Sequence, residues 1–199
     1  MPLSFEEEIR AIATHYLNGA NTVYPRSFVI EKIVDFDEIN SEVSETSNGA
    51  YYSSEGEQKA QQALNELRDQ LQKSVETADK VSTDALEAEK KDAQTGSKPS
   101  SSFADEMRKK AQKLKDDFET HVDATTNTII KIGETFPASQ EIIKSGWDKA
   151  AQIFTNALDA IVGIFNKIAE GVLWLVDKVK QAWNAVKNWV SDTWHKLFG

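Results

Sequence analysis

The chain has 199 residues, of which 40 % are hydrophobic and 28 % charged, a size that allows one domain or a domain with an extension. Its formal net charge is −9, and the sequence has no stripe of basic residues that could track the phosphate backbone of a nucleic acid. Both features argue against general nucleic-acid binding. The absence of cysteine excludes disulfides, thiolate metal sites and cysteine nucleophiles.

Charge and aromatic content change in opposite directions along the chain. The first fifty residues hold nine acidic and three basic residues, whereas residues 151–199 hold four and five, together with four of the five tryptophans. The acidic N-terminus has no apolar core segment, so no secretory signal peptide is predicted. We expect a cytoplasmic protein or one peripheral to a membrane, with export by a signal-independent route left open.

Residues 1–40 are predicted to form a small unit of mixed character. Ser4 and Glu7 have the spacing of a capping box and are followed by apolar residues at helical spacing, which predicts a helix from about Phe5 to Leu17. The segment 27–36 is rich in β-branched and aromatic residues and is compatible with a strand or a short helix. Residues 41–54 are polar and turn-rich, and they are predicted to form a loop.

A long helix is predicted for residues 55–92. Its apolar seam alternates spacings of four and three, but it is made of small and partly polar residues. Such a helix is not stable alone and must lie against a more apolar partner. The predicted seam residues are Ala60, Leu64, Leu67, Leu71, Ser74, Ala78, Val81 and Ala85.

Residues 93–102 are rich in glycine, proline and serine and are predicted to be a flexible linker. A further helix then begins near Ser102 and is closed by Pro137, with Ser139 placed to cap the next helix. Residues 103–199 are therefore predicted to form a helical hairpin whose second arm is rich in tryptophan.

The second arm carries a heptad pattern without interruption. With Trp147 at position d, apolar residues occupy almost every a and d position through the end of the chain. The d positions are Trp147, Phe154, Ile161, Ile168, Leu175, Ala182 and Trp189, and the a positions are Ala151, Leu158, Phe165, Val172, Val179, Val186 and Thr193.

A straight helix from Trp147 to the end of the given sequence would span roughly 75–80 Å at 1.5 Å per residue. A compact bundle would have to fold this helix back. Gly163 and Gly171 are the predicted bend points, and Ser145–Gly146 is a further candidate break. The fold class predicted from these elements is all-α, an elongated bundle or coiled coil of long amphipathic helices with a small mixed N-terminal unit.

The tryptophans suggest a function for the heptad face. Trp174, Trp183 and Trp194 fall at positions c, e and b, off the seam, and indole rings are typical of helices at a lipid–water boundary. Residues 103–199 also resemble, in pattern only and without a signature motif, exchangeable apolipoproteins and helical pore-forming toxins. We therefore expect a membrane- or lipid-binding, self-associating and pore-forming protein. The predicted interface residues are Trp174, Trp183, Trp189, Trp194, Phe154, Ile161, Phe165, Ile168, Val172 and Leu175.

Two other interpretations of the same face stand beside this one. It can be the core of a soluble bundle, or it can bind a like chain or a partner protein as a coiled coil of three or four helices. In solution we expect the helices at 55–92 and 102–136 to cover the face. Because the seam of the first is weak, we expect the linker at 93–102 to let this cover move away on lipid.

The sequence indicates neither an enzyme nor a metal or cofactor site. His15, His121 and His195 are far apart, and none is followed three or four residues later by a second histidine or a carboxylate. The segment 35–45 has Ile39 and Asn40 where a calcium loop needs a ligand and a glycine, so it does not match such a loop. We expect a non-enzymatic protein without cofactors, whose partners are a lipid surface and further copies of itself.

Overall fold

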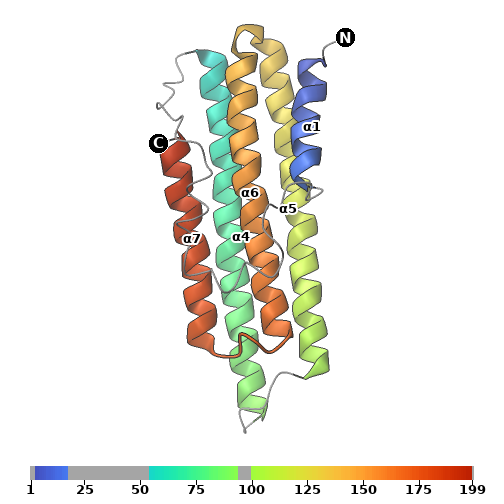
Figure 1. The fold of residues 1–199 in the computed structure, drawn as a ribbon, viewed down its shortest axis with the longest axis vertical. Coiled ribbons are helices and arrows are strands. Elements are labelled where there is room, and N and C mark those ends of the chain that lie inside the picture. The colour runs from blue at the N-terminus through green and yellow to red at the C-terminus, as the bar shows by residue number, and fades with distance from the viewer. Residues whose placement is uncertain (1–2, 18–53, 94–99, 199) are drawn as a thin grey trace.

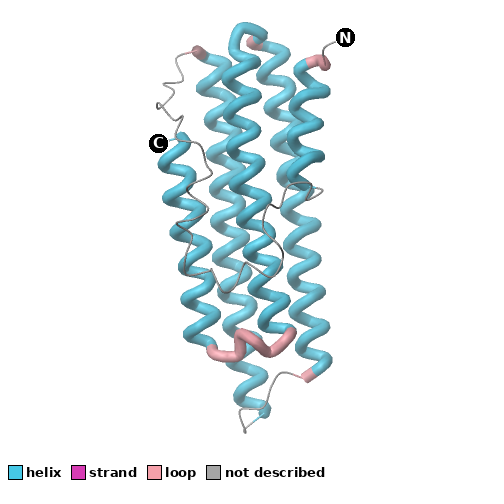
Figure 2. The backbone as a smooth tube through the Cα atoms, in the orientation of Figure 1, coloured by secondary structure: helices cyan, strands magenta, loops and turns pink. Residues whose placement is uncertain are grey.

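The computed structural model describes residues 3–17, 54–93 and 100–198. Within these ranges the chain is an elongated helical bundle, which confirms the predicted all-α class, and Figure 2 shows almost all of the described part as helix, with a loop between the last two helices. The predicted strand or helix at 27–36 and almost all of the loop at 41–54 lie outside the described residues. The elements are α1 (Phe5–Leu17), α4 (Glu55–Ala93), α5 (Ser101–Thr135), the 3-10 turn η1 (Pro137–Ser139), α6 (Gln140–Ala169) and α7 (Val176–Phe198).

The four long helices run alternately up and down (Figure 1). The α5–α6 hairpin, joined through η1, forms the centre together with α4. The short α1 packs against α5 and α6 at one edge of the bundle, and α7 packs against α4 and α6 at the opposite edge. The first and last described helices are therefore both edge elements.

Local capping explains where the first helices begin. At α1 the Ser4 amide donates to Glu7 Oε2 (2.7 Å) and the Glu7 amide donates to Ser4 Oγ (3.3 Å), the reciprocal pair that the sequence predicted. Ser54 and Glu57 make the same two hydrogen bonds at α4, each 3.3 Å long. At α5 the Ser100 hydroxyl accepts from the Phe103 amide (3.2 Å). The predicted bounds of these three helices hold to within about two residues.

The predicted seam of α4 is correct at Ala60, Leu64, Leu67, Leu71 and Ala78 and wrong by one residue at the other three positions. Ser74, Val81 and Ala85 are only partly buried, and the next residue along the chain takes the inner position in each case. The spacing is thus four, three, four repeated over eleven residues, or 3.67 residues per turn, which follows a straight helix more closely than a heptad does. The inner residues are Ala60, Leu64, Leu67, Leu71, Val75, Ala78, Ser82 and Leu86.

Residues 103–199 form three helices rather than the predicted hairpin of two. The chain reverses at residues 170–175, and of the three predicted break points only Gly171 is used. Gly163 and Ser145–Gly146 lie inside the continuous helix α6. Ser139 makes no capping bond to α6, because its hydroxyl instead lies 2.9 Å from the hydroxyl of Ser54 at the start of α4.

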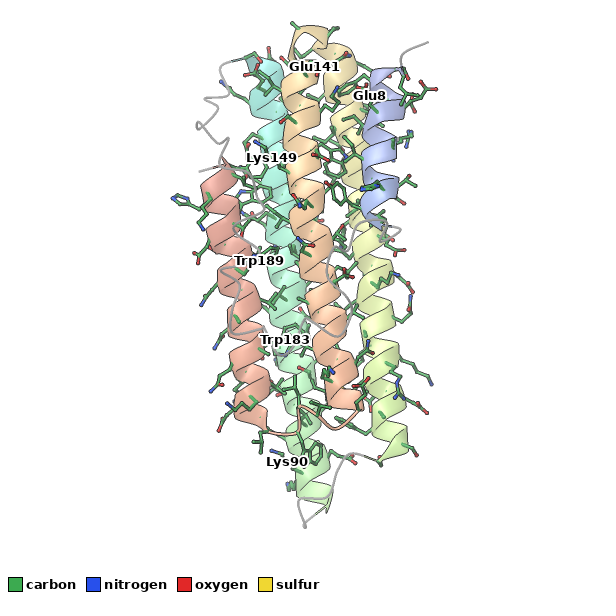
Figure 3. The ribbon with its side chains drawn as sticks, in the orientation of Figure 1. Glu8, Lys90, Glu141, Lys149, Trp183 and Trp189 are labelled. Atoms are coloured by element: carbon green, nitrogen blue, oxygen red, sulfur yellow. The ribbon has the colours of Figure 1, made fainter. Side chains whose placement is uncertain are left out.

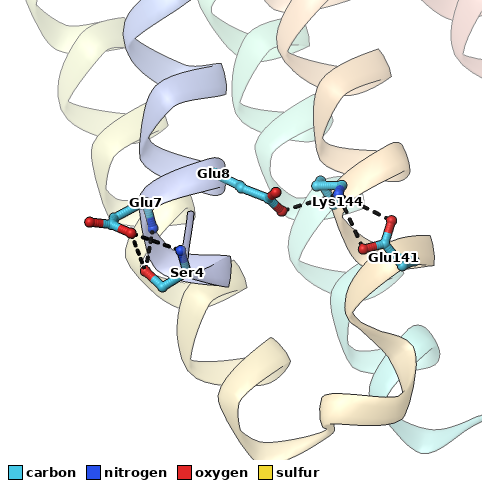
Figure 4. A network of polar contacts seen from close by, with 5 residues as sticks. All are labelled: Ser4, Glu7, Glu8, Glu141 and Lys144. Carbon is cyan, nitrogen blue, oxygen red and sulfur yellow. Dashed lines mark hydrogen bonds and ion pairs between the residues drawn. The ribbon is translucent and has the colours of Figure 1, made fainter. Parts of the chain in front are cut away.

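The edge helix α1 is attached to α6 by polar as well as apolar contacts. The Lys144 ammonium bridges Glu8 (3.1 Å) and Glu141 (3.1 Å), next to the capping pair of Ser4 and Glu7 (Figure 4). The buried Trp147 indole donates to the carbonyl oxygen of Ile9 (3.3 Å). Hydrogen bonds to both carboxylates raise the pKa of Lys144 above its ordinary value.

Candidate interaction surface on helix α7 and the α6–α7 turn

Helix α7 places its tryptophans inside the bundle. Trp183, Trp189 and Trp194 are 0, 5 and 4 % exposed, and Figure 3 shows Trp183 and Trp189 on the side of α7 toward α4. The heptad assignment placed Trp194 on the polar side of the helix, but its ring lies 5.8 Å from that of Phe154 on α6. The off-seam tryptophans are thus explained in this state by packing, because the face that α7 buries is wider than its heptad seam.

Two of these indoles bind polar side chains of α4. Trp183 Nε1 donates to Ser82 Oγ (2.9 Å), and Trp194 Nε1 donates to Asn65 Oδ1 (3.2 Å). Between them, Lys187 Nζ reaches Asp79 Oδ2 at 2.7 Å. Helix α4 therefore presents α7 with a row of polar groups along an otherwise apolar interface.

Aromatic contacts hold the other side of α7 to α6. The Trp183 ring meets the Phe165 ring edge to face, with centroids 5.8 Å apart. Trp194 lies between Phe154 and Phe198, with centroids at 5.8 and 4.4 Å, and the Arg68 guanidinium lies over its ring at 5.6 Å. Aromatic pairs of this kind stabilise by about 0.5–1.5 kcal/mol beyond the area they bury.

The turn between α6 and α7 is closed by a Schellman motif. Gly171 has φ 71°, its amide donates to Ile168 O (3.0 Å), and the Val172 amide donates to Lys167 O (2.9 Å). Glycine is favoured here because a side chain strains a left-handed backbone. The motif ends α6 at Ala169, two residues before Gly171, and turns the chain back toward α4.

This turn carries an exposed apolar patch. Val172 and Leu175 are 61 and 60 % exposed, whereas Trp174 is partly buried, with its ring 6.3 Å from that of Phe103 and 5.7 Å from Lys90 Nζ. The patch lies at the end of the bundle where α4 ends and α5 begins (Figure 1).

The predicted interface residues thus divide into two groups in the structure. Seven are buried inside the bundle: Trp183, Trp189, Trp194, Phe154, Ile161, Phe165 and Ile168. The other three, Trp174, Val172 and Leu175, gather on the α6–α7 turn.

The sequence did not identify Asn65, Asp79 and Ser82 as partners of α7. The signal that could have found Ser82 is the eleven-residue spacing of α4, which places it on the inner side with Leu71 and Ala60.

In the described part of the chain, no group of three histidine or acidic residues could hold a metal ion. No described helix has an apolar stretch sufficient to cross a bilayer. His121 borders a shallow depression between α4 and α5, together with Glu66, Gln70 and Thr125.

The chain matches no protein-family model, and neither the curated proteins nor the solved structures compared with it show significant similarity. The functional proposals below therefore depend on the geometry of α7 and the α6–α7 turn.

Proposed function

We propose that this protein binds lipid surfaces by releasing α7 from the edge of the bundle and laying its tryptophan-rich face on the lipid. The observation that carries the proposal is the pairing of Trp183 and Trp194 with the polar side chains of Ser82 and Asn65. A lipid headgroup region offers the same two properties, an apolar layer for the rings and acceptors for their N–H groups.

The position of α7 favours its release over that of any central helix. It is bounded by α4 and α6, and it follows a turn rather than lying between two long helices. The sequence suggested that residues 55–92 would move away, but α4 packs against α5, α6 and α7 together, so its departure would open the whole core. Release of α7 breaks its interfaces with α4 and α6 and leaves the contacts among α1, α4, α5 and α6 in place.

The exposed turn supplies a first point of contact with lipid. Val172 and Leu175 are available without any rearrangement, and they immediately precede α7. Insertion of these two side chains would bring α7 to the surface before its own apolar residues are released. Lipid then compensates for the apolar surface of α7 that leaves the bundle.

A pair of cross-links tests the proposal. Cysteines at Glu87 and Lys180, whose side chains are 3.8 Å apart, join α4 to α7 through a short bis-maleimide, and no native cysteine competes. The matched control joins the opposite edge helix through cysteines at Glu8 and Lys144, which are 3.1 Å apart. Tryptophan emission and release of a trapped dye are then measured with liposomes of neutral or anionic lipid.

We expect the protein cross-linked between α1 and α6 to bind liposomes as the unmodified protein does. The protein cross-linked between α4 and α7 should lose the lipid-dependent change in tryptophan emission. Dye release with binding indicates perforation, and binding without dye release indicates coating of the surface. Equal binding by both locked proteins would show that α7 stays in place. If lipid leaves the emission of the unmodified protein unchanged, the lipid proposal fails and the tryptophans belong to the core of a soluble bundle.

A further inference from the structure

The heptad pattern continues through the turn at which the helix breaks. Twelve of the fourteen residues at positions a and d between Trp147 and Thr193 are at most 7 % exposed, and the two exceptions are Val172 and Leu175 in the turn. These two exceptions have the same spacing from their neighbours in α6 and α7 as every other pair in the repeat. The turn residues thus match an apolar seam that the folded-back arrangement does not use.

The opposite side of the helix also keeps its pattern through the break. Glu170 and Asp177 occupy position f on either side of the turn, in line with Lys149 and Asn184. The segment 170–175 contains no proline, and Gly171 is its one weak helix former. The sequence of the turn is therefore compatible with helix, and the reversal rests on the Schellman motif at Gly171.

We infer that α6 and α7 have a second arrangement, a continuous helix from Gln140 to Phe198, in which α7 occupies the α4–α6 surface of a second copy of this chain. Such a helix would be roughly 90 Å long at 1.5 Å per residue, so its α7 end could not reach its own α4. Val172 and Leu175 would then lie on the apolar seam, between the two bundles.

A second copy is the partner that this surface fits best, because every group that α7 satisfies is present again. The vacated surface of each chain offers Ser82 and Asn65 to indole N–H groups and Asp79 to a lysine, and α7 of the other chain carries the matching Trp183, Trp194 and Lys187. Reciprocal exchange restores both interfaces and closes as a two-fold dimer. The difference between monomer and dimer is then limited to the turn and to the cost of association.

Two substitutions move this equilibrium in opposite directions. Gly171→Ala disfavours the left-handed turn and favours continuous helix, and together these effects shift the balance by roughly 30-fold or more for each chain. Val176→Pro acts in the reverse sense. As the first residue of α7 it tolerates proline in the folded-back form, whereas proline inside a continuous helix breaks it.

Exchange is detected by mixing two differently tagged chains, one with Glu87→Cys and the other with Lys180→Cys. The two are unfolded together, refolded at high concentration without lipid, and treated with a short bis-maleimide. Because the cross-linked side chains face each other across the α4–α7 interface, a product that joins the two tags reports α7 of one chain on α4 of the other. Far-UV circular dichroism verifies that each variant has folded.

We expect the product joining the tags to form in the wild-type background, to increase at least tenfold with Gly171→Ala, and to fall toward background with Val176→Pro. Adding Val172→Ser and Leu175→Ser to Gly171→Ala should reduce it again, although both side chains are exposed in the folded-back form. If the yield is the same in the Gly171→Ala and Val176→Pro backgrounds, the inference is wrong. Should Gly171→Ala fail to fold, the comparison of wild type with Val176→Pro decides. Since no lipid is present, failure here is separate from failure of the lipid proposal.

Discussion

At the scale of single residues, two glycines set how closely helices approach one another. A Cβ atom built on Gly133 in α5 would lie 2.0 Å from Cε1 of Phe5 in α1, and one built on Gly56 would lie 2.5 Å from the Cβ of Phe136. Neither distance is compatible with van der Waals packing. The first contact lets the Phe5 ring pack against the backbone of α5 and sets the spacing of the α1 edge.

Gly133→Ala should therefore destabilise the protein. Overpacking of this kind costs about 1–3 kcal/mol, and it opposes a gain of about 1 kcal/mol from replacing glycine within a helix. Urea unfolding followed by circular dichroism measures the net change. In a Phe5→Leu background, the same substitution should lose much of its cost, because the colliding ring is gone. If Gly133→Ala destabilises the Phe5→Leu protein as much as the wild type, the contact with Phe5 is not the cause.

At the scale of elements, α4 serves different partners along its length. Its eleven-residue spacing keeps the inner residues nearly in line along the helix axis, so that α4 contacts α5, α6 and α7 over many turns. The spacing also places the polar Ser82 on the inner row, where it faces α7, and the partly buried Asn65 lies beside that row. The indole N–H groups of α7 make these positions acceptable, and they also make the α4–α7 interface sensitive to loss of a single hydrogen bond.

Ser82→Ala tests that sensitivity from the α4 side. It leaves the buried indole N–H of Trp183 without its acceptor, which costs about 1–3 kcal/mol, so α7 should open about tenfold more often. Under the release mechanism, this variant binds liposomes faster than wild type, although no tryptophan has changed. Stopped-flow tryptophan emission measures the rate. A rate at or below that of wild type would contradict release as the limiting step.

Alkaline pH should weaken the opposite edge helix. Partial burial, together with the nearby Asp148 carboxylate 3.1 Å from the hydroxyl, raises the pKa of Tyr16 to about 12. A tyrosine with a raised pKa stabilises the fold fully below its unfolded value of about 10, and this contribution is lost as the pH rises toward about 12. The stability of wild type should therefore fall more steeply over that range than that of Tyr16→Phe. Parallel slopes in urea unfolding would show that Tyr16 is not responsible.

At the scale of the whole molecule, the bundle has a centre formed by α4, α5 and α6 and one helix at each edge (Figure 1). The C-terminal edge helix, α7, is joined to α6 through the short turn at 170–175, in which Gly171 adopts the left-handed conformation that reverses the chain. Local opening in proteins follows such elements with few neighbours, so α7 is expected to open as a unit.

Hydrogen exchange of the intact protein without lipid checks this expectation. Amides in the middle of α7 should exchange together, and markedly faster than the central amides of α6. In both the wild type and the Val176→Pro variant, the central amides of α6 should exchange only at the rate of global unfolding. If α6 and α7 exchange at one common rate, α7 does not open separately.

Much of the helical framework could be read from local signals. The Ser4–Glu7 capping pair and the proline after Phe136 are properties of a few neighbouring residues, and the helices they delimit begin and end close to where the sequence predicts. The heptad positions of α6 and α7 are also correct, because twelve of fourteen are buried. The second capping pair, Ser54 and Glu57, has the same pattern and was missed as a signal.

The sequence by itself determined that this chain forms long amphipathic helices and which side of the last segment is apolar, because capping and periodicity act within one or two turns. Only the tertiary structure decided where that segment reverses, which residues of α4 meet it, and that Trp183 and Trp194 are buried. The contacts of Trp183 and Trp194 join residues more than a hundred positions apart in the chain, which local patterns do not report. The reversal uses Gly171 and leaves Gly163 inside α6. The heptad pattern does not mark the reversal, since it runs through the turn unchanged.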